Sequence, residues 1–377
     1  MVQEVTTTSW GKRIINAFWG MLIGIALIIG AIYLIFWNEG NSLHTAQSLA
    51  QTEKVIISIP NAPIDAKNDM HVVYLTGPAN TNNVLTDKLF NISEKAIQLN
   101  RQVEMYQWEE NKETTTEKEM GGSEKEITNY TYEQVWSTKE IASADFKEQT
   151  GHQNPVSMPI RSKIQYAKDV TVGDFKLPFD LVQQITGNTN VDLSKADTAA
   201  LQTKFHKPVK MQGDQLYVGN DADLPKIGDL RIGITEVLPQ TVSIISQQSG
   251  NILQPYMAPA GESVSLIEMG QISPQEMIHN AEVQNRVMMW ILRLVSLVMM
   301  IIGFAMLMSP LSVLADVIPF LGSIVSIGTG LIAFVAGFGL WIVCLAIAWF
   351  VVRPLLSVIM ITVVILLFGW LYIRKRK

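Results

Sequence analysis

The chain has 377 residues, 48% of them hydrophobic, and a formal net charge of −5 at pH 7. Its single cysteine, Cys344, leaves no pair for an intramolecular disulfide. Residues 38–284 carry 20 Lys or Arg against 32 Asp or Glu, a net charge of −12, whereas the two ends are basic. Because nucleic-acid binding needs clustered cations, this acidic middle argues against nucleic acid as a partner.

The N-terminal residues 1–17 are followed by an apolar run over residues 18–37. About twenty uncharged residues match the hydrocarbon thickness of a bilayer, and aromatic residues at both ends of the run suit the headgroup layers. No small-residue cleavage site follows, so we expect a retained first transmembrane helix rather than a removed signal peptide. Residues 42–51 have helical spacing and predict a separate surface helix.

Residues 38–286 contain short β-branched runs broken by Gly and Pro, which is typical of an α+β domain with a mainly antiparallel sheet. Within it, residues 102–109 and 127–137 are predicted to be the two arms of a hairpin. The connection between them, residues 110–126, is rich in Glu, Lys and Thr. We expect this connection to be a solvated, mobile loop.

A long helix is predicted to begin at Ser273-Pro274, because Ser is a good cap and Pro suits the first helical position. It should continue through a second span at residues 287–308. The remaining segments are predicted to be a cytoplasmic turn (309–320), a third span (321–352), a fourth span (355–373) and a basic cytoplasmic tail (374–377).

The positive-inside rule places both basic ends of the chain on the cytoplasmic side. Two ends on one side require an even number of spans, which the four predicted spans satisfy. The acidic residues 38–286 then lie across the membrane, in a periplasm, a lumen or the extracellular space. The sequence therefore predicts a membrane protein with four transmembrane α-helices and a large extracytoplasmic α+β domain inserted between spans 1 and 2.

Signatures of catalysis are missing from the sequence, which has no His-Glu-x-x-His, no Gly-x-Ser-x-Gly and no phosphate-binding loop. The five histidines share no ligand spacing. The sequence leaves a Ser/Lys dyad at the membrane surface open, but no signature supports it. We therefore expect no enzymatic activity, no metal and no cofactor.

Four charged residues fall at a similar depth near the outer ends of the predicted spans: Glu39, Arg286, Arg293 and Arg353. A charge in hydrocarbon is costly unless it is paired. One hypothesis is that Glu39 pairs with Arg293 or Arg353 and so locks the spans together. The alternative, given equal weight, is that both arginines extend to lipid headgroups.

The third predicted span contains Ala333 and Gly337, small residues four positions apart that permit close helix contact. They suit packing within one helix bundle or association between copies of the chain, and the sequence leaves both interpretations open. Asp316, between two prolines, is interpreted as a turn or cap residue.

Short motifs in a shared order give the chain a family resemblance. They are Asn38-Glu39-Gly40, Val103–Trp108, Tyr130–Trp136, His152-Gln153-Asn154-Pro155, Gly228–Arg231, Trp290–Arg293, the spacing of Leu314, Asp316 and Pro319, and Arg353-Pro354-Leu355. With these motifs the chain resembles the transmembrane protein 43 family, also called LUMA, over nearly its whole length. It departs from the family in the charged 110–126 segment and at Val317, where an aromatic residue is expected.

The resemblance implies a self-associating four-span protein with a large lumenal domain and no enzymatic activity. Animal members reside in the endoplasmic reticulum and inner nuclear membrane and help to organise the nuclear envelope with lamins and emerin; bacterial members also exist. The composition favours a bacterial inner membrane here, with the animal location as the alternative. Asn91 and Asn129 lie in sequons that matter only in a eukaryotic lumen.

The leading functional hypothesis is a non-enzymatic scaffold in the lipid bilayer that forms homo-oligomers and organises other membrane proteins through its outer domain. A channel or transporter component is the alternative, although the middle thirds of the predicted spans contain no ionisable group to line a pore. A membrane-anchored enzyme is the third and least supported class.

Overall fold

The computed structural model describes residues 2–352, 358–359 and 362. The chain forms two compact units. The first comprises residues up to Gln3 with Ala50–Glu113 and Asn129–His279, and the second comprises Glu4–Leu49, Thr114–Thr128 and the chain from Asn280 onward. Arg353 and the predicted tail (374–377) lie outside the described residues, as does nearly all of the predicted fourth span (355–373).

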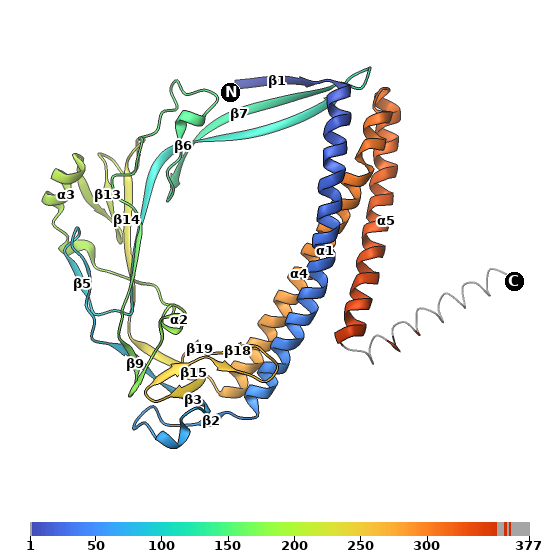
Figure 1. The fold of residues 1–377 in the computed structure, drawn as a ribbon. Helices are drawn as coiled ribbons and strands as arrows, with labels where there is room; N and C mark the ends of the chain where they lie inside the picture. Colours follow the sequence, from blue (N-terminus) through green and yellow to red (C-terminus); the bar gives the residue numbers. More distant parts are fainter. Residues whose placement is uncertain (1, 353–357, 360–361, 363–377) are drawn as a thin grey trace. The chain divides into compact units, whose positions relative to one another are not determined.

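Three long helices dominate the second unit: α1 (Trp10–Glu53), α4 (Pro274–Ala315) and α5 (Pro319–Val352). Each is long and apolar enough to cross a membrane. The three run side by side (Figure 1). Buried residues from all of them form a shared apolar core, which contains Ala31, Ile35, Met300, Cys344 and Ala348. The chain is therefore an integral membrane protein.

The helix α1 continues without a break from the first predicted span to Glu53. The separate surface helix predicted over residues 42–51 is therefore wrong, because these residues belong to α1. Polar residues near the end of the predicted span do not interrupt a helix when no Gly-Pro or Pro breaker follows them.

The helix α4 begins at Pro274, as predicted, but continues through Pro310 to Ala315. The predicted turn over residues 309–320 is thereby reduced to 316–318. A proline inside a helix lacks the N–H that would bond the carbonyl four residues earlier. Here that carbonyl, of Met306, accepts a hydrogen bond from the Ser309 hydroxyl at 2.8 Å. The neighbouring serine compensates for the proline, so the helix can pass it.

One sheet has eight strands in the order β1-β7-β6-β14-β13-β12, with β11 beside β14 and β8 beside β6. Their bounds are β1 (Val2–Thr8), β6 (Gln98–Lys118), β7 (Glu124–Ser137), β8 (Lys163–Tyr166), β11 (Thr189–Asn190), β12 (Val209–Gln212), β13 (Gln215–Val218) and β14 (Leu230–Val237). In the central antiparallel pair, Leu230 of β14 faces Met105 of β6 and Val237 faces Gln98. Buried residues alternate along β14, as expected for a half-buried strand.

The other large sheet has seven strands in the order β19-β15-β16-β10-β9-β3-β2, with β15 also paired to β3. Their bounds are β2 (Ile57–Ser58), β3 (Val72–Thr81), β9 (Val170–Val172), β10 (Phe175–Lys176), β15 (Gln240–Ser249), β16 (Ile252–Gln254) and β19 (Leu266–Met269). Its buried side chains form a core of their own around Val73, Leu75, Phe175, Val242 and Ile244. The predicted α+β domain with a mainly antiparallel sheet is confirmed.

Smaller elements complete the first unit. They are the ribbons β4 (Leu85–Asp87) with β5 (Ile92–Glu94) and β17 (Tyr256–Met257) with β18 (Ser263–Val264), the helices α2 (Phe179–Val182) and α3 (Thr198–Phe205), and the 3₁₀ helices η1 (Ala66–Asn68), η2 (Ser143–Asp145) and η3 (Leu193–Lys195).

The hairpin formed by β6 and β7 is longer than predicted, and residues 110–126 are not a mobile loop. Strand pairing continues to the turn, and side chains also pair across it, for example Asn111 with Glu133 at 2.6 Å. Gly121 and Gly122 give the turn its positive φ angles, +90° and +82°. Both faces of this ribbon are polar, so its sequence lacks the alternation that marks a half-buried strand.

Candidate functional site

Charged side chains form two clusters in the second unit, each centred on a buried carboxylate, one toward each end of the helices. The Glu39 cluster consists of Glu39, Trp290, Arg293 and Trp349, and the Asp316 cluster consists of Arg13, Lys118, Glu124 and Asp316. Arg13 and Glu39 are both in α1. They are 26 positions apart in the sequence, which corresponds to about 39 Å along the helix axis.

The Glu39 cluster joins all three long helices through one carboxylate. Arg293 in α4 donates from Nε to Glu39 Oε1 at 2.6 Å and from Nη2 to Oε2 at 2.8 Å. Trp349 in α5 donates from Nε1 to Glu39 Oε2 at 2.9 Å. The side chains of Arg293 and Glu39 are only 4% and 5% exposed. A bidentate pair of this kind fixes orientation as well as distance, and so locks α1 to α4 in one register.

Two indole rings lie against the Arg293 guanidinium. Its central carbon is 4.7 Å from the centroid of the Trp290 ring and 5.2 Å from that of Trp349. Cations are attracted to the faces of aromatic rings, most strongly to Trp. Trp349 therefore contacts both members of the ion pair, the carboxylate through its N–H and the guanidinium through its ring.

Polar side chains near the Glu39 cluster connect the helices further. Asn38 donates to the Met289 carbonyl at 3.1 Å, and Asn285 donates to the Ser42 carbonyl at 2.9 Å. These two amides link α1 to α4 in opposite directions. The contacts extend the lock over about two helical turns.

Small residues let the helices approach closely within one chain. A Cβ atom placed on Gly24 of α1 would lie 2.7 Å from the Gly303 carbonyl oxygen of α4. On Gly337 of α5 it would lie 3.0 Å from the Cα of Ile301, also in α4. Ala333 is fully buried. Gly337 therefore serves packing inside the bundle, the first of the two interpretations drawn from its sequence spacing.

The Asp316 cluster brings the hairpin turn to the start of α1. Arg13 contacts Asp316 Oδ2 at 2.5 Å and Glu124 Oε2 at 2.9 Å, and donates from Nη1 to the Gly122 carbonyl at 2.6 Å. Lys118 Nζ lies 2.7 Å from Asp316 Oδ1. The Asp316 side chain is 1% exposed. Two cations and two carboxylates compensate one another, so Asp316 is more than the turn or cap residue inferred from its sequence.

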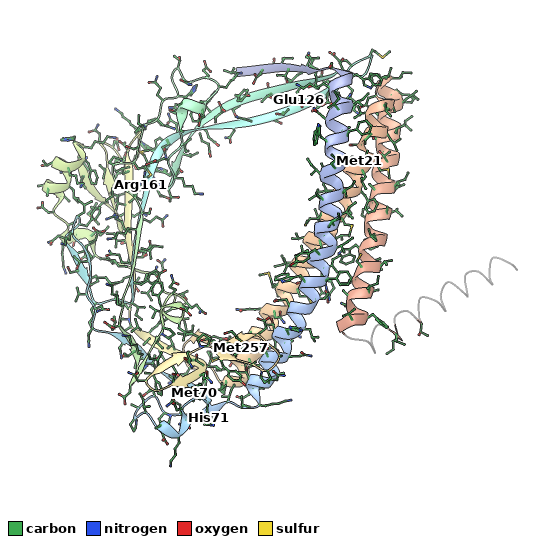
Figure 2. The ribbon with its side chains drawn as sticks, in the orientation of Figure 1. Met21, Met70, His71, Glu126, Arg161 and Met257 are labelled. Carbon is green, nitrogen blue, oxygen red and sulfur yellow. The ribbon has the colours of Figure 1, made fainter. Side chains whose placement is uncertain are left out.

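Backbone contacts also hold the hairpin turn in place. The Gly121 N–H donates to the Val317 carbonyl at 3.0 Å, and the Trp10 indole donates to the Val313 carbonyl at 2.9 Å. A Cβ on Gly122 would lie 2.4 Å from Trp10 Cδ1, so only glycine fits beside this ring. Figure 2 labels Glu126, which lies on β7 close to the hairpin turn.

Comparison with known proteins now places the chain in a family. The sequence profile described as Transmembrane protein 43 matches residues 105–354, a range that includes Arg293, Asp316 and most of the hairpin. The chain belongs to the Transmembrane protein 43 family. Human Transmembrane protein 43 is 30% identical over 355 residues, which cover 91% of this chain and 87% of the human protein.

More distant relatives extend the same match. The mouse Transmembrane protein 43 is 29% identical over 355 residues, again 91% of this chain and 87% of the relative. The Transmembrane protein 43 homolog of Drosophila melanogaster is 27% identical over 350 residues, 89% of each chain. No solved structure matches the chain. The relatives carry no enzymatic name.

The structure pairs Glu39 with Arg293, one of the two partners considered from the sequence, while Arg353 lies outside the described residues. Trp349, Lys118 and the role of Arg13 were not predicted from the sequence. A signal for Trp349 existed, because a buried indole N–H usually needs an acceptor and Glu39 lies at a similar depth. Lys118 had no such signal, since it belongs to a run of charged residues that reads as solvated surface.

Within the described part of the chain, no three His, Cys, Asp or Glu side chains are grouped so that they could hold a metal ion. In the first unit, Glu236 is a buried carboxylate, 8% exposed, whose Oε2 has no hydrogen-bond partner. Burial, and secondarily the nearby Glu94, raise the pKa of Glu236 above its ordinary value of 4.5.

Proposed function

We propose that this protein is a non-enzymatic, multi-pass membrane scaffold that self-associates and organises partner proteins through its large β-rich domain. The observation that carries the proposal is the Glu39 cluster. It ties three apolar helices together with a desolvated bidentate ion pair, a device suited to a fixed anchor rather than to a moving transport pathway. Both α1 and α4 run without a break past this pair, toward the segments that enter and leave the first unit.

Membership of the Transmembrane protein 43 family supports the scaffold in a second way. The alignment with the human relative extends over 91% of the chain, so the aligned residues include both the long apolar helices and β-rich segments of this chain. We infer the partners to be the lipid bilayer, further copies of the chain and other membrane proteins, without nucleic acid. Cytoplasmic termini and a bacterial inner membrane, or an endoplasmic reticulum or inner nuclear membrane, belong to the same proposal.

The native mass of the detergent-purified protein tests self-association, measured by light scattering on a size-exclusion column and corrected for bound detergent. The expected result is a discrete mass of several protomers. The same preparation is then placed in liposomes, where the scaffold predicts no ion flux above empty vesicles. A monomer at all concentrations refutes the oligomer, and selective ion flux would establish the channel class instead.

Partner recruitment is tested separately by crosslinking in native membranes. The tagged wild-type chain is compared with Glu39→Gln, which keeps the shape of the side chain but removes its charge. The scaffold predicts reproducible neighbours for the wild type and fewer for the variant at equal expression. An identical set of neighbours for both chains would show that the Glu39 cluster has no part in the scaffold.

A further inference from the structure

A polar recess with a volume of about 310 Å³ opens on the eight-stranded sheet of the first unit, on the face of β14 opposite its buried core. The pairing register places Gly233 of β14 between Gln215 of β13 and Gln102 of β6. Because this glycine lies between two long side chains, it leaves a hollow whose floor is backbone. A glycine inside a strand often marks a place where a ligand approaches the backbone closely. The volume is at the lower end of the roughly 300–1,000 Å³ typical of small-molecule sites.

The side chains around Gly233 are neutral hydrogen-bonding groups with one exception, the Asp214 carboxylate. The neutral members are Gln102, Asn190, Gln212, Gln215 and Thr235. The register sets them in rows across the strands, since Gln212 faces Gln215 and Asn190 faces Thr235. Asp214 Oδ2 accepts a hydrogen bond from Asn190 Nδ2 at 2.9 Å, so these two side chains orient each other. Among the described residues that line the recess, none is a cation and none has a large apolar side chain.

The cation of β14 is engaged outside the recess. Arg231 lies two residues before Gly233, on the same face of the strand. Its guanidinium carbon is 4.1 Å from the centroid of the Trp136 ring, and Glu104 faces it across the pair of β14 and β6. An aromatic face and a cross-strand carboxylate both stabilise a cation. The charge of the recess is therefore that of Asp214 alone.

These groups favour one class of small ligand. An anionic ligand would meet Asp214 without a cation in the recess, and bringing like charges together is unfavourable. An acyl chain would remove water from the carboxamides without replacing their hydrogen bonds. An extended peptide pairs its backbone with a free strand edge rather than with the face of a sheet. Hydroxyl groups both donate and accept, as carboxamides do, so a rigid ring with several hydroxyls can satisfy this lining.

We propose that the recess around Gly233 binds a neutral carbohydrate, with Gln102 and Gln215 contacting hydroxyl groups of one sugar ring from its two sides. The absent side chain of Gly233 lets the ring approach the backbone of β14. Asp214 supplies a charged acceptor, to which a hydroxyl donates a stronger hydrogen bond than to a neutral one. Free oligosaccharides and the headgroups of glycolipids share this chemistry. The site is independent of the proposed scaffold, because it needs neither a second copy of the chain nor the long helices.

A glycan array tests the proposal with the full chain. The protein is purified in a polyoxyethylene detergent, because maltoside and glucoside detergents have sugar headgroups that would compete. The array presents neutral and acidic glycans side by side, and saturable binding to neutral glycans is the expected result. Binding to none of them, or to acidic glycans alone, overturns the proposal. Competition by the free oligosaccharide, or only by vesicles that contain the same glycan as a glycolipid, then distinguishes the two sources, and either result supports the site.

Matched variants locate the binding at the recess. Gln102→Leu replaces one carboxamide by an apolar group of similar size, and Gly233→Val fills the floor. A Cβ on Gly233 would lie 3.4 Å from the nearest atom of Gln215, an ordinary contact, and β-branched residues suit strands. Each variant should weaken binding about tenfold or more, because a ligand hydroxyl loses its partner or its space.

The control is Gln134→Leu, the same change at an exposed position of β7 that does not line the recess. It should bind as the wild type does. Thermal unfolding checks that each variant is folded, and Gln102→Leu decides alone if Gly233→Val is not. Wild-type affinity in the folded recess variants would place the carbohydrate elsewhere and overturn the proposal, as would an equal loss in Gln134→Leu.

Discussion

The two buried charge clusters of this protein achieve similar electrostatic balance with different parts of the chain. The Glu39 cluster takes every member from the long helices, and its central pair is one carboxylate with one guanidinium. The Asp316 cluster combines the start of α1 and the turn after α4 with a hairpin more than 100 residues from either. The first can form when helices meet in a membrane, whereas the second also needs a folded β-ribbon.

The Glu39 cluster therefore couples the helices to one another, whereas the Asp316 cluster couples the hairpin turn to the helices. Loss of the Glu39 pair should weaken the helix bundle itself, because nothing else neutralises Arg293 among the contacts described. Loss of a member of the Asp316 cluster should release the hairpin turn while the helices stay together.

The largest effect is expected for Glu39→Gln, which leaves a buried guanidinium without its carboxylate. Removing one partner of a buried pair typically costs about 3–5 kcal/mol. Thermal unfolding of the purified protein measures the loss, with Arg286→Gln, an exposed change in α4, the helix of Arg293, as the control. The double swap Glu39→Arg with Arg293→Glu should recover part of the stability. Equal melting temperatures for Glu39→Gln and Arg286→Gln would contradict the lock.

Asp316→Asn should have a smaller effect, because Glu124 still compensates Arg13. Hydrogen bonds to charged groups contribute about 1.5–3 kcal/mol each, so we expect a loss of that order, concentrated in the hairpin. Hydrogen–deuterium exchange should rise in residues 114–128 and stay unchanged around Arg293. Exchange that rises equally in both regions would show that the two clusters act as one.

Gly122→Ala is expected to cost about 1–2 kcal/mol for the left-handed backbone, plus the clash with Trp10. Gly121→Ala is the matched control, since it has a similar φ but no atom within 4 Å of its added Cβ. The difference between the two variants in hydrogen–deuterium exchange of the turn residues therefore isolates the contact with Trp10. If both variants behave alike, the turn is not seated against the indole.

Unlike Glu39 and Asp316, Glu236 is a buried carboxylate with no cation in contact among the described residues, and Glu236→Gln tests what this costs. Because its pKa is raised, the folded state favours the protonated form, and stability falls as pH rises above the ordinary value of 4.5. Glutamine imitates the neutral form and should raise the melting temperature at pH 7.5. The rise should be about 2–4 °C for each kcal/mol gained in the free energy of unfolding. The gain should shrink toward pH 4.5; a gain that is independent of pH would assign it to another cause.

Local signals predicted the helices of this fold better than the hairpin. Ser273 and Pro274 marked the start of α4 because a helix cap is a local feature. By contrast, α4 continues through Pro310 because the Ser309 hydroxyl donates to the Met306 carbonyl. This hydrogen bond depends on the side-chain rotamer of Ser309, which the sequence does not determine. The hairpin beyond Glu109 was missed because its stability comes from pairing and from docking on residues far away in sequence, not from an apolar face.

Of the site residues, Glu39 and Arg293 were accessible to sequence reasoning because an isolated charge beside an apolar run demands a partner. Arg13 was counted only as an end charge that orients the helix. Its partner Asp316 lies 303 residues away, and no periodicity connects the two. Such a pair is visible only when the fold has placed α1 beside the turn that follows α4.

The order of synthesis gives the Asp316 cluster a temporal meaning. Arg13, Lys118 and Glu124 are all synthesised long before Asp316. During translation, Arg13 and Lys118 are therefore present before the Asp316 carboxylate that pairs with both of them. The cluster closes only after α4 has been produced and has delivered its C-terminal end to the start of α1. The cluster can therefore form only when both α1 and α4 are present. In a nascent or truncated chain that stops before α4, the hairpin turn has no Asp316 to contact.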